Sequence, residues 1–167
     1  KVDSPDVGMS YSMNHYQGCE HGCVYCYARN THEYWGYGPG LDFESRILVK
    51  ADAPALLEAH LRKPGWKASP IVLSGNTDCY QPAEREFGLT RCCLQVFLKY
   101  RHPVGIITKN ALLLRDLDLL KELHRFGLVR VYISVTSLQE DTRRLLEPRT
   151  ATTARRLKTI EKLAGEG

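Results

Sequence analysis

The sequence has no apolar run that approaches the roughly 18–20 residues needed for a membrane-spanning helix. It also has no recognisable signal peptide, because residues 1–10 are polar and contain no apolar central segment. Neither an internal repeat nor a low-complexity tract is present among the 167 residues. These absences argue against a membrane protein, a secreted protein and a repeat array. The length and composition are typical of one globular domain, which we expect in the cytoplasm.

The sequence also has little excess of positive over negative charge, since its formal net charge is only +4. Such an excess permits nucleic-acid binding but does not argue for it. Toward the end of the chain several basic residues gather, namely Arg143, Arg144, Arg149, Arg155, Arg156 and Lys158. They predict a positively charged face, although exposed helices carry such charges routinely. A nucleic-acid partner is therefore an open alternative.

Short apolar runs alternate with amphipathic segments along the sequence, which indicates strands joined by helices. Strands are expected at 9–13, 70–73, 104–107 and 129–135, and helices at 26–34, 53–63, 89–100, 113–125, 139–146 and 153–164. This order predicts an α/β fold with parallel strands and right-handed crossovers, either an open doubly wound sheet or a barrel. The chain starts without Met and stops after a helix where another strand would follow. We therefore expect a fragment of a longer protein.

Polar residues follow each expected strand. They are the loop around Cys19 to Cys26, then residues 74–78, 108–110 and 134–137. In parallel α/β folds the chemistry lies at the carboxyl ends of the strands. The sequence therefore predicts an active site built from these four segments.

Cysteine spacing is the sharpest chemical signal in the chain. Six cysteines without a secretion signal indicate a reduced, intracellular protein. Three of them form a C-x3-C-x2-C motif at Cys19, Cys23 and Cys26. Thiolates suit both zinc and iron–sulfur clusters. Zinc would need a fourth ligand from His15, His21 or the distant Cys79, whereas three cysteines on a [4Fe–4S] cluster would leave one iron open. A non-catalytic zinc or iron–sulfur module is thus an alternative to an enzyme.

The motif, with the aromatic Tyr25 before its last cysteine, resembles the signature of the radical S-adenosylmethionine (SAM) superfamily. The resemblance implies that Cys19, Cys23 and Cys26 bind a [4Fe–4S] cluster whose fourth iron is chelated by SAM. It implies reductive cleavage of SAM to a 5′-deoxyadenosyl radical, which abstracts a hydrogen atom from a substrate. It further implies an external electron donor of the flavodoxin or ferredoxin type. The implied fold is a partial (βα)6 TIM-type barrel, of which residues 1–167 would form the N-terminal part, about four βα units.

Three further segments resemble the branch related to spore photoproduct lyase. They are residues 78–84, residues 107–110 and Glu147-Pro148-Arg149. This resemblance implies that Ser74, Lys109 and Ser134 contact SAM, and that Tyr25 lies near the adenine. Asp78 and Arg149 are further candidates for binding the cofactor. Their alternatives are a turn cap for Asp78 and an ordinary surface arginine for Arg149.

The sequence departs from the family pattern in two places. Segment 74–78 lacks the glutamate of the Gly-Gly-Glu-type segment that meets the methionine amino group of SAM in the family. Spore photoproduct lyase uses a cysteine as hydrogen donor at the position of Leu73, and Cys79 lies in a different local setting. Lyase-type DNA repair is therefore only an alternative function. The substrate and any catalytic side chain stay undefined at this level, and His15 and His21 are expected near the cysteine loop without being ligands.

Overall fold

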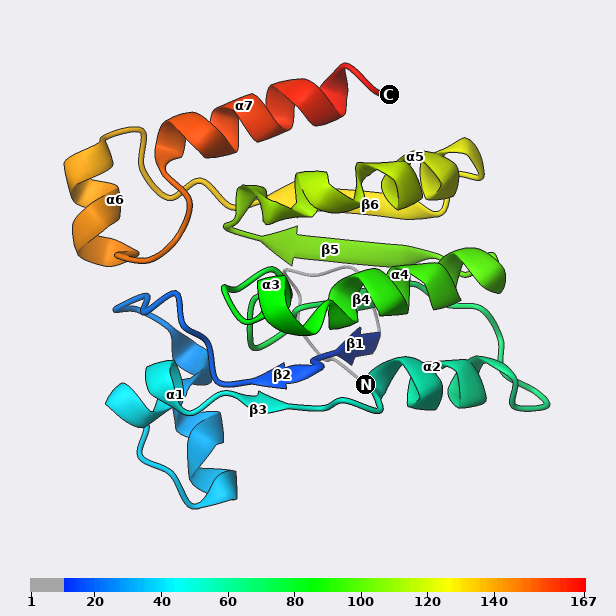
Figure 1. The fold of residues 1–167 in the computed structure, drawn as a ribbon, viewed down its shortest axis with the longest axis horizontal. Helices are drawn as coiled ribbons and strands as arrows, with labels where there is room; N and C mark the ends of the chain where they lie inside the picture. Colours follow the sequence, from blue (N-terminus) through cyan, green and yellow to red (C-terminus); the bar gives the residue numbers. More distant parts are fainter. Residues whose placement is uncertain (1–10) are drawn as a thin grey trace.

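The computed structural model describes residues 11–167 (Figure 1). Its main sheet has four parallel strands in the order β1 (Tyr11–Met13), β4 (Ile71–Leu73), β5 (Val104–Thr108) and β6 (Val129–Ile133). The connecting helices are α2 (Ala53–Leu61), α3 (Glu84–Phe87), α4 (Leu89–Lys99), α5 (Leu117–Arg125), α6 (Glu140–Leu146) and α7 (Thr153–Ala164). The α/β prediction is confirmed.

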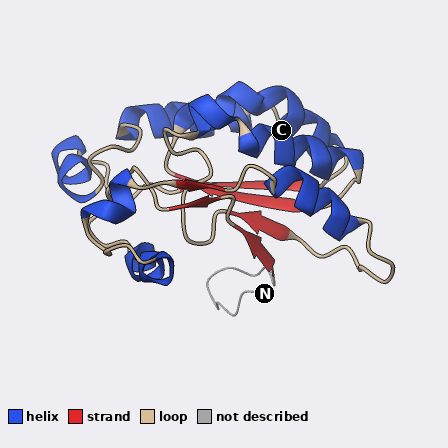
Figure 2. Ribbon diagram, turned by 60° about the horizontal axis from the view of Figure 1, so that its bottom comes forward, coloured by secondary structure: helices blue, strands red, loops and turns tan. Residues whose placement is uncertain are grey.

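Helices cover one face of the sheet, and this decides between the two architectures left open by the sequence. Figure 2 shows them arching together over the strands, and α4 contacts both α2 and α5. A doubly wound sheet would carry helices on both faces, whereas a barrel carries them only outside. The arrangement is that of part of a (βα) barrel. No helix in residues 11–167 has the length and apolarity required to cross a bilayer.

The strand register brings the carboxyl ends of the strands level. Met13 lies opposite Leu73, and Leu73 lies opposite Ile106. On the other side of β5, Thr108 lies opposite Ile133. The four loops that follow the strands therefore start at one edge of the sheet, as the sequence predicts.

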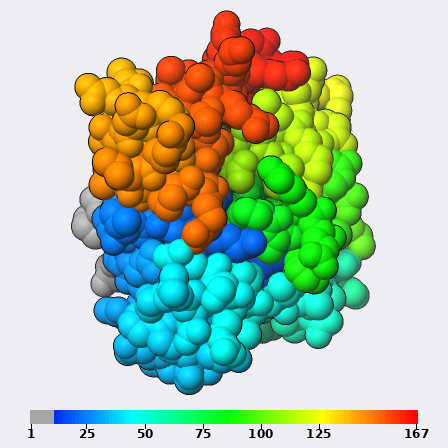
Figure 3. Space-filling view, turned by 60° about the vertical axis from the view of Figure 1, so that its left-hand side comes forward, coloured from blue at the N-terminus to red at the C-terminus, as the bar shows by residue number. Residues whose placement is uncertain are grey.

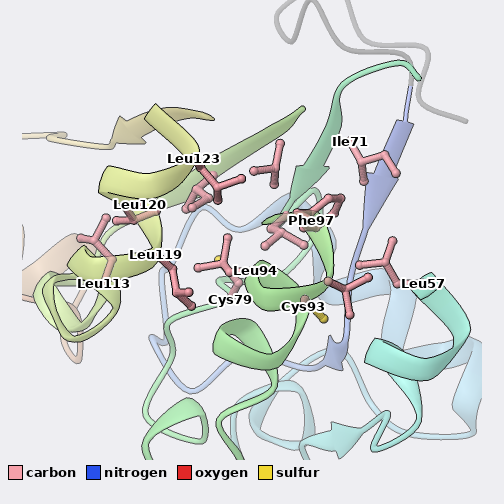
Figure 4. Close-up of a cluster of buried hydrophobic side chains, with 14 of the residues drawn as sticks. Leu57, Ile71, Cys79, Cys93, Leu94, Phe97, Leu113, Leu119, Leu120 and Leu123 are labelled. Carbon is pink, nitrogen blue, oxygen red and sulfur yellow. The ribbon is translucent and has the colours of Figure 1, made fainter. Parts of the chain in front are cut away.

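The hydrophobic core fills the layer between the sheet and its helices (Figure 4). β4 is buried on all three residues, and α4 inserts the fully buried Leu94 and Phe97. Leu120 and Leu123 of α5 pack against the same cluster. The core thus holds the strands and helices rigid behind the edge where the loops converge.

A smaller layer precedes the main sheet. The sequence predicts a brief extended run at 46–50, where β3 lies, but it does not predict β2 or the pairing of the two strands. β2 (Tyr16–Gln17) pairs antiparallel with β3 (Leu48–Val49). Between them lie the 3-10 helix η1 (Tyr27–Trp35) and the short helix α1 (Leu41–Ser45). Two-residue strands fall below the length at which alternation of apolar and polar residues is detectable. The helix expected at 26–34 is therefore present, but in the tighter 3-10 form.

Of the element boundaries that differ from the expectations, two lie next to predicted site residues. The helix expected at 113–125 begins as the 3-10 helix η2 (Ala111–Asp116), because the Asn110 side chain caps it by accepting from the Leu112 N–H. The last strand ends at Ile133 instead of residue 135. Ser134, expected within the strand, consequently lies beyond it, as does Thr136.

Truncation of Phe97 should cost much stability, because its side chain projects from α4 and is completely buried in the core. We expect Phe97→Ala to lower the free energy of unfolding by about 3–5 kcal/mol, through lost burial and the cavity left behind. Gln95→Ala, on the exposed side of the same helix, should change it by less than about 0.5 kcal/mol. Urea unfolding of both variants measures the difference, and equal losses would contradict the assigned core.

Candidate active site

A cavity of about 300 Å³ opens at the carboxyl ends of β1, β4 and β5. Its wall comes from segments far apart in the sequence: the cysteine loop, segment 74–78 and the end of β5. Among the site residues expected from the sequence, those on the wall are Cys19, Cys23, Tyr25, Cys26, Ser74, Asp78 and Lys109. In Figure 3 the cysteine loop (blue) lies between segments of cyan, green and orange, which follow it in the sequence. Tertiary structure therefore brings seven of the nine expected residues together.

The three motif cysteines present free thiols to this one cavity. Cys19 and Cys23 are buried and Cys26 is partly buried. Burial raises the pKa of Cys19 to about 12. Burial also raises the pKa of Cys23 to about 11, against the opposing effect of the Lys109 ammonium. A metal centre bound here would have to displace protons from these thiols, so its affinity should rise with pH.

The donor set fits a cluster better than a single ion. Within residues 11–167, no group of three His, Cys, Asp or Glu side chains converges closely enough to ligate one metal ion. His21 Nδ1 lies 3.4 Å from Asp78 Oδ2, so this ring is directed to Asp78. A [4Fe–4S] cluster differs because each cysteine binds a different iron. Three separated thiols around one cavity meet that requirement.

The cysteine loop is locked by its backbone and by a distant glutamine. Gly18 has φ +84°, and a Cβ there would lie 2.9 Å from the Phe43 carbonyl oxygen. The Cys19 N–H donates to that same carbonyl at 2.8 Å. Gln81 accepts from the Glu20 N–H at 3.0 Å and donates to the Gly18 carbonyl at 3.1 Å. The position before Cys19 therefore accepts only glycine, and the loop is fastened to the segment after β4.

Segment 74–78 forms a turn around the side chain of Asn14. Ser74 has φ +78°, a left-handed conformation that is costly for a residue with a side chain. The turn aims the N–H groups of Gly75 and Asn76 at Asn14 Oδ1, each at 2.9 Å, with Thr77 N–H at 3.4 Å. Such convergent N–H groups form an anion-binding nest. Here a neutral amide oxygen fills the nest and ties β1 to the loop after β4.

Asp78 uses its carboxylate to join three segments. It accepts from the Thr108 hydroxyl and the Lys109 N–H at 2.7 Å each, and from the Tyr80 N–H at 2.8 Å. With His21 also beside it, both carboxylate oxygens are engaged by the protein. Asp78 thus lies on the cavity wall but acts as a turn and strand-end cap.

Lys109 presents its charge differently. It lines the cavity, and no carboxylate among residues 11–167 forms an ion pair with its ammonium. Its Nζ lies 6.0 Å from the centre of the Tyr25 ring. Tyr27 stands on the same wall and donates its hydroxyl to the Gly75 carbonyl, which bridges the cysteine loop and segment 74–78. An uncommitted cation beside aromatic rings suits an anionic group on a ligand.

Ser134 and Arg149 are not on the cavity wall. The Ser134 N–H donates to the Thr108 carbonyl at 2.9 Å, and its own carbonyl accepts from Arg156 at 2.8 Å. Arg149 donates to the Glu20 carbonyl and forms an ion pair with Glu44. Both residues therefore support the loops around the cavity in this structure.

The basic face expected near the end of the chain is smaller than the sequence suggests. Arg143 and Arg156 are buried, with Arg143 paired to Glu140 and Arg156 paired to Glu147. Glu140 lies three positions before Arg143 on the same face of α6, and Glu147 lies nine positions before Arg156 at the end of that helix. The four remaining basic residues of that stretch are exposed.

Sequence reasoning missed several residues that shape the site. They are Asn14, Tyr27, Gln81 and Glu147. Three of them carried a signal, since Asn14 follows a strand directly and Gln81 and Glu147 lie in segments that resemble the branch related to spore photoproduct lyase. Their contacts could not be predicted, because each of these contacts joins distant parts of the chain. His15 is buried, bonded to Thr90 at 2.8 Å, and off the cavity wall. Burial lowers its pKa to about 4, so it is neutral at pH 7.

The nest around Asn14 yields a test of the site's scaffold. Asn14→Ala leaves three backbone N–H groups without their acceptor, so we expect the free energy of unfolding to fall by about 1–3 kcal/mol. Asn14→Asp keeps the acceptor and adds the negative charge that a nest favours, so stability should be retained. Urea unfolding compares the two variants. Equal destabilisation by Asp and Ala would show that the amide oxygen is not the group that matters.

Proteins of similar sequence occur in bacteria and archaea. An uncharacterized protein of Mycobacterium tuberculosis is 37% identical over 157 residues, covering 94% of this chain and 46% of its own length. An uncharacterized protein of Methanocaldococcus jannaschii is 31% identical over 161 residues, covering 96% and 57%. The chain spans about half the length of these curated relatives.

Solved structures show the same fold. A spore photoproduct lyase complexed with dinucleoside spore photoproduct superposes with a TM-score of 0.71 at 20% identity, over 100% of this chain and 46% of that one. A mutant lyase with bound AdoMet and the same dinucleoside gives the same TM-score, identity and coverage. Residues 13–167 match the profile of the Radical SAM superfamily. Since that match spans nearly the whole chain, the protein belongs to the radical SAM superfamily.

Proposed function

We propose that residues 1–167 form the N-terminal part of a radical SAM core domain, with a [4Fe–4S] cluster on Cys19, Cys23 and Cys26 and SAM beside it. The observation that carries the proposal is the convergence on one cavity of three free thiols and a lysine that has no carboxylate partner within residues 11–167. When bound and reduced by an external flavodoxin- or ferredoxin-type donor, such a cluster supplies the electron that cleaves SAM to a hydrogen-abstracting 5′-deoxyadenosyl radical. The enzyme class follows from that chemistry.

The chain's own residues would bind and orient the cofactor. The Lys109 ammonium is free to pair with the carboxylate of SAM as a point charge. Tyr25 and Tyr27 offer aromatic surface at the same wall, where they would cover the adenosine end and limit access of water. Ser74 Oγ is already bound to the Cys79 N–H at 2.7 Å. Ser74 would therefore contribute through the shape of its turn and its remaining hydrogen-bonding capacity.

DNA-lesion reversal is a weaker candidate for this chain. Leu73 stands where the resemblance places the hydrogen-donating cysteine of spore photoproduct lyase, and its side chain is completely buried in the core. Cys79 is also buried in that core and is not on the cavity wall. A thiol donor to a substrate radical would have to reach the cavity. We therefore propose a radical SAM reaction without assigning a photoproduct as its substrate.

The cluster is tested by anaerobic iron–sulfur reconstitution and electron paramagnetic resonance (EPR) of the reduced protein. We expect about four irons per chain and a [4Fe–4S]⁺ signal that changes when SAM is added. Cys23→Ala should abolish the signal, while Cys92→Ala, an exposed cysteine away from the cavity, should keep it. Bound zinc with no response to SAM, or a full signal in Cys23→Ala, would overturn the proposal.

The role of Lys109 is tested by the affinity for SAM. Lys109→Met removes a charge-assisted hydrogen bond worth about 1.5–3 kcal/mol, so the Kd for SAM should rise about tenfold to a hundredfold. Lys158→Met, on the exposed surface of α7, is the matched control and should leave the Kd unchanged. Equilibrium titration of the cluster-loaded protein measures both variants. An unchanged Kd for Lys109→Met would show that the lysine does not contact the cofactor.

A further inference from the structure

Residues 146–151 fasten the end of the chain to the cysteine loop. The Val24 N–H donates to the Leu146 carbonyl at 3.0 Å, and the Arg149 N–H donates to the His21 carbonyl at 3.2 Å. On the far side of the segment, the Ala151 N–H donates to the Lys109 carbonyl at 3.2 Å. Two walls of the cavity are thus held by one segment that does not itself line it.

Glu147 is the charged centre of this segment. Its side chain is completely buried, and each carboxylate oxygen accepts a hydrogen bond from a side chain. Oε2 accepts from Arg156 Nη2 at 2.6 Å, and Oε1 accepts from the Tyr25 hydroxyl. Arg156 is equally buried and also donates to the carbonyls of Ala151 at 2.9 Å and Ser134 at 2.8 Å. The pair is therefore satisfied on both sides, as a buried ion pair must be.

Tyr25 connects this buried pair to the cavity. Its ring lies on the cavity wall and is about half exposed, while its hydroxyl reaches back to Glu147. Burial would raise the pKa of Glu147, but the hydrogen bonds from Tyr25 and Arg156 outweigh it and lower this pKa. The carboxylate is consequently charged at pH 7 and is a strong acceptor. Without that acceptor, little else fixes a half-exposed ring.

We propose that Glu147 is a positioning residue for the cofactor site, which acts by holding the Tyr25 ring in place through the phenol hydroxyl. The inference rests on the proposed SAM site and deepens it. An anchored ring meets the ligand without losing side-chain freedom on binding, so the anchor strengthens binding without touching the ligand. The competing explanation is that Glu147 serves only to neutralise Arg156 and hold α6 and α7 in place.

A double-mutant cycle separates the two explanations. Tyr25→Phe removes only the hydroxyl, keeps the ring, and leaves the Glu147–Arg156 pair intact. We expect it to raise the Kd for SAM about threefold to tenfold, and to lower the midpoint of thermal unfolding by less than Glu147→Gln does, because Arg156 keeps its counter-charge. Glu147→Gln should raise the Kd by up to the same factor, because its amide oxygen is a weaker acceptor for the Tyr25 hydroxyl than the carboxylate is. It should also lower that midpoint, because Arg156 loses its counter-charge. Tyr34→Phe, a residue of η1 that is 90% exposed, is the matched control.

The decisive result is the Kd of Tyr25→Phe/Glu147→Gln in the cluster-loaded chain. If Glu147 acts through Tyr25, the double variant binds SAM no more weakly than the worse single variant. Additive losses, or a Tyr25→Phe variant with wild-type affinity, would overturn the positioning role. Wild-type protein is titrated first, with the SAM-induced change of its EPR signal as the readout. Absence of that change would be a failure of the proposed function, which is a different result from a failure of the cycle.

Discussion

Parallel pairing of β1, β4, β5 and β6 in a common register is the constraint on which the site depends. It places the four loops that follow the strands at the same edge of the sheet. The helices pack over one face of the sheet and do not cover this edge. Backbone groups in such loops have no sheet partner, yet burial requires that they be bonded. The loops therefore form hydrogen bonds with one another, and the cavity lies between the loops that are joined in this way.

Most polar side chains around the cavity serve this mutual bonding. Asn14 gathers three N–H groups of the next loop, Asp78 joins three segments, and Gln81 holds both sides of Gly18. Glu147 joins the cysteine loop to α7 in the same way, because it accepts hydrogen bonds from both Tyr25 and Arg156. A polar residue near a cofactor site is thus not automatically a ligand for the cofactor. What distinguishes Lys109 is that its charge has no carboxylate partner in the described chain.

Membership of the radical SAM superfamily gives this arrangement a chemical meaning. Buried, protonated thiols become good ligands when a metal centre displaces their protons, and the neighbouring ammonium of Lys109 favours the thiolate form of Cys23. The same ammonium is available to an anionic cofactor. One cation could therefore help both components of the site, which explains why a lysine at the end of β5 is more informative than the arginines exposed nearby.

The sequence by itself determined the features that depend on neighbours in the chain. The apolar runs of β4 and β5 and the amphipathic helices are local patterns, and the structure confirms them except at their ends. The cysteine spacing is also a local pattern, and the cluster that it predicts stays a prediction. Tertiary structure alone placed the partners of Asp78, Ser134 and Arg149, because these partners lie far away in sequence: Thr108 meets Asp78 across 30 positions, Arg149 meets Glu44 across 105, and Tyr25 meets Glu147 across 122. Charge and burial at such positions are products of packing, which no local pattern of residues encodes.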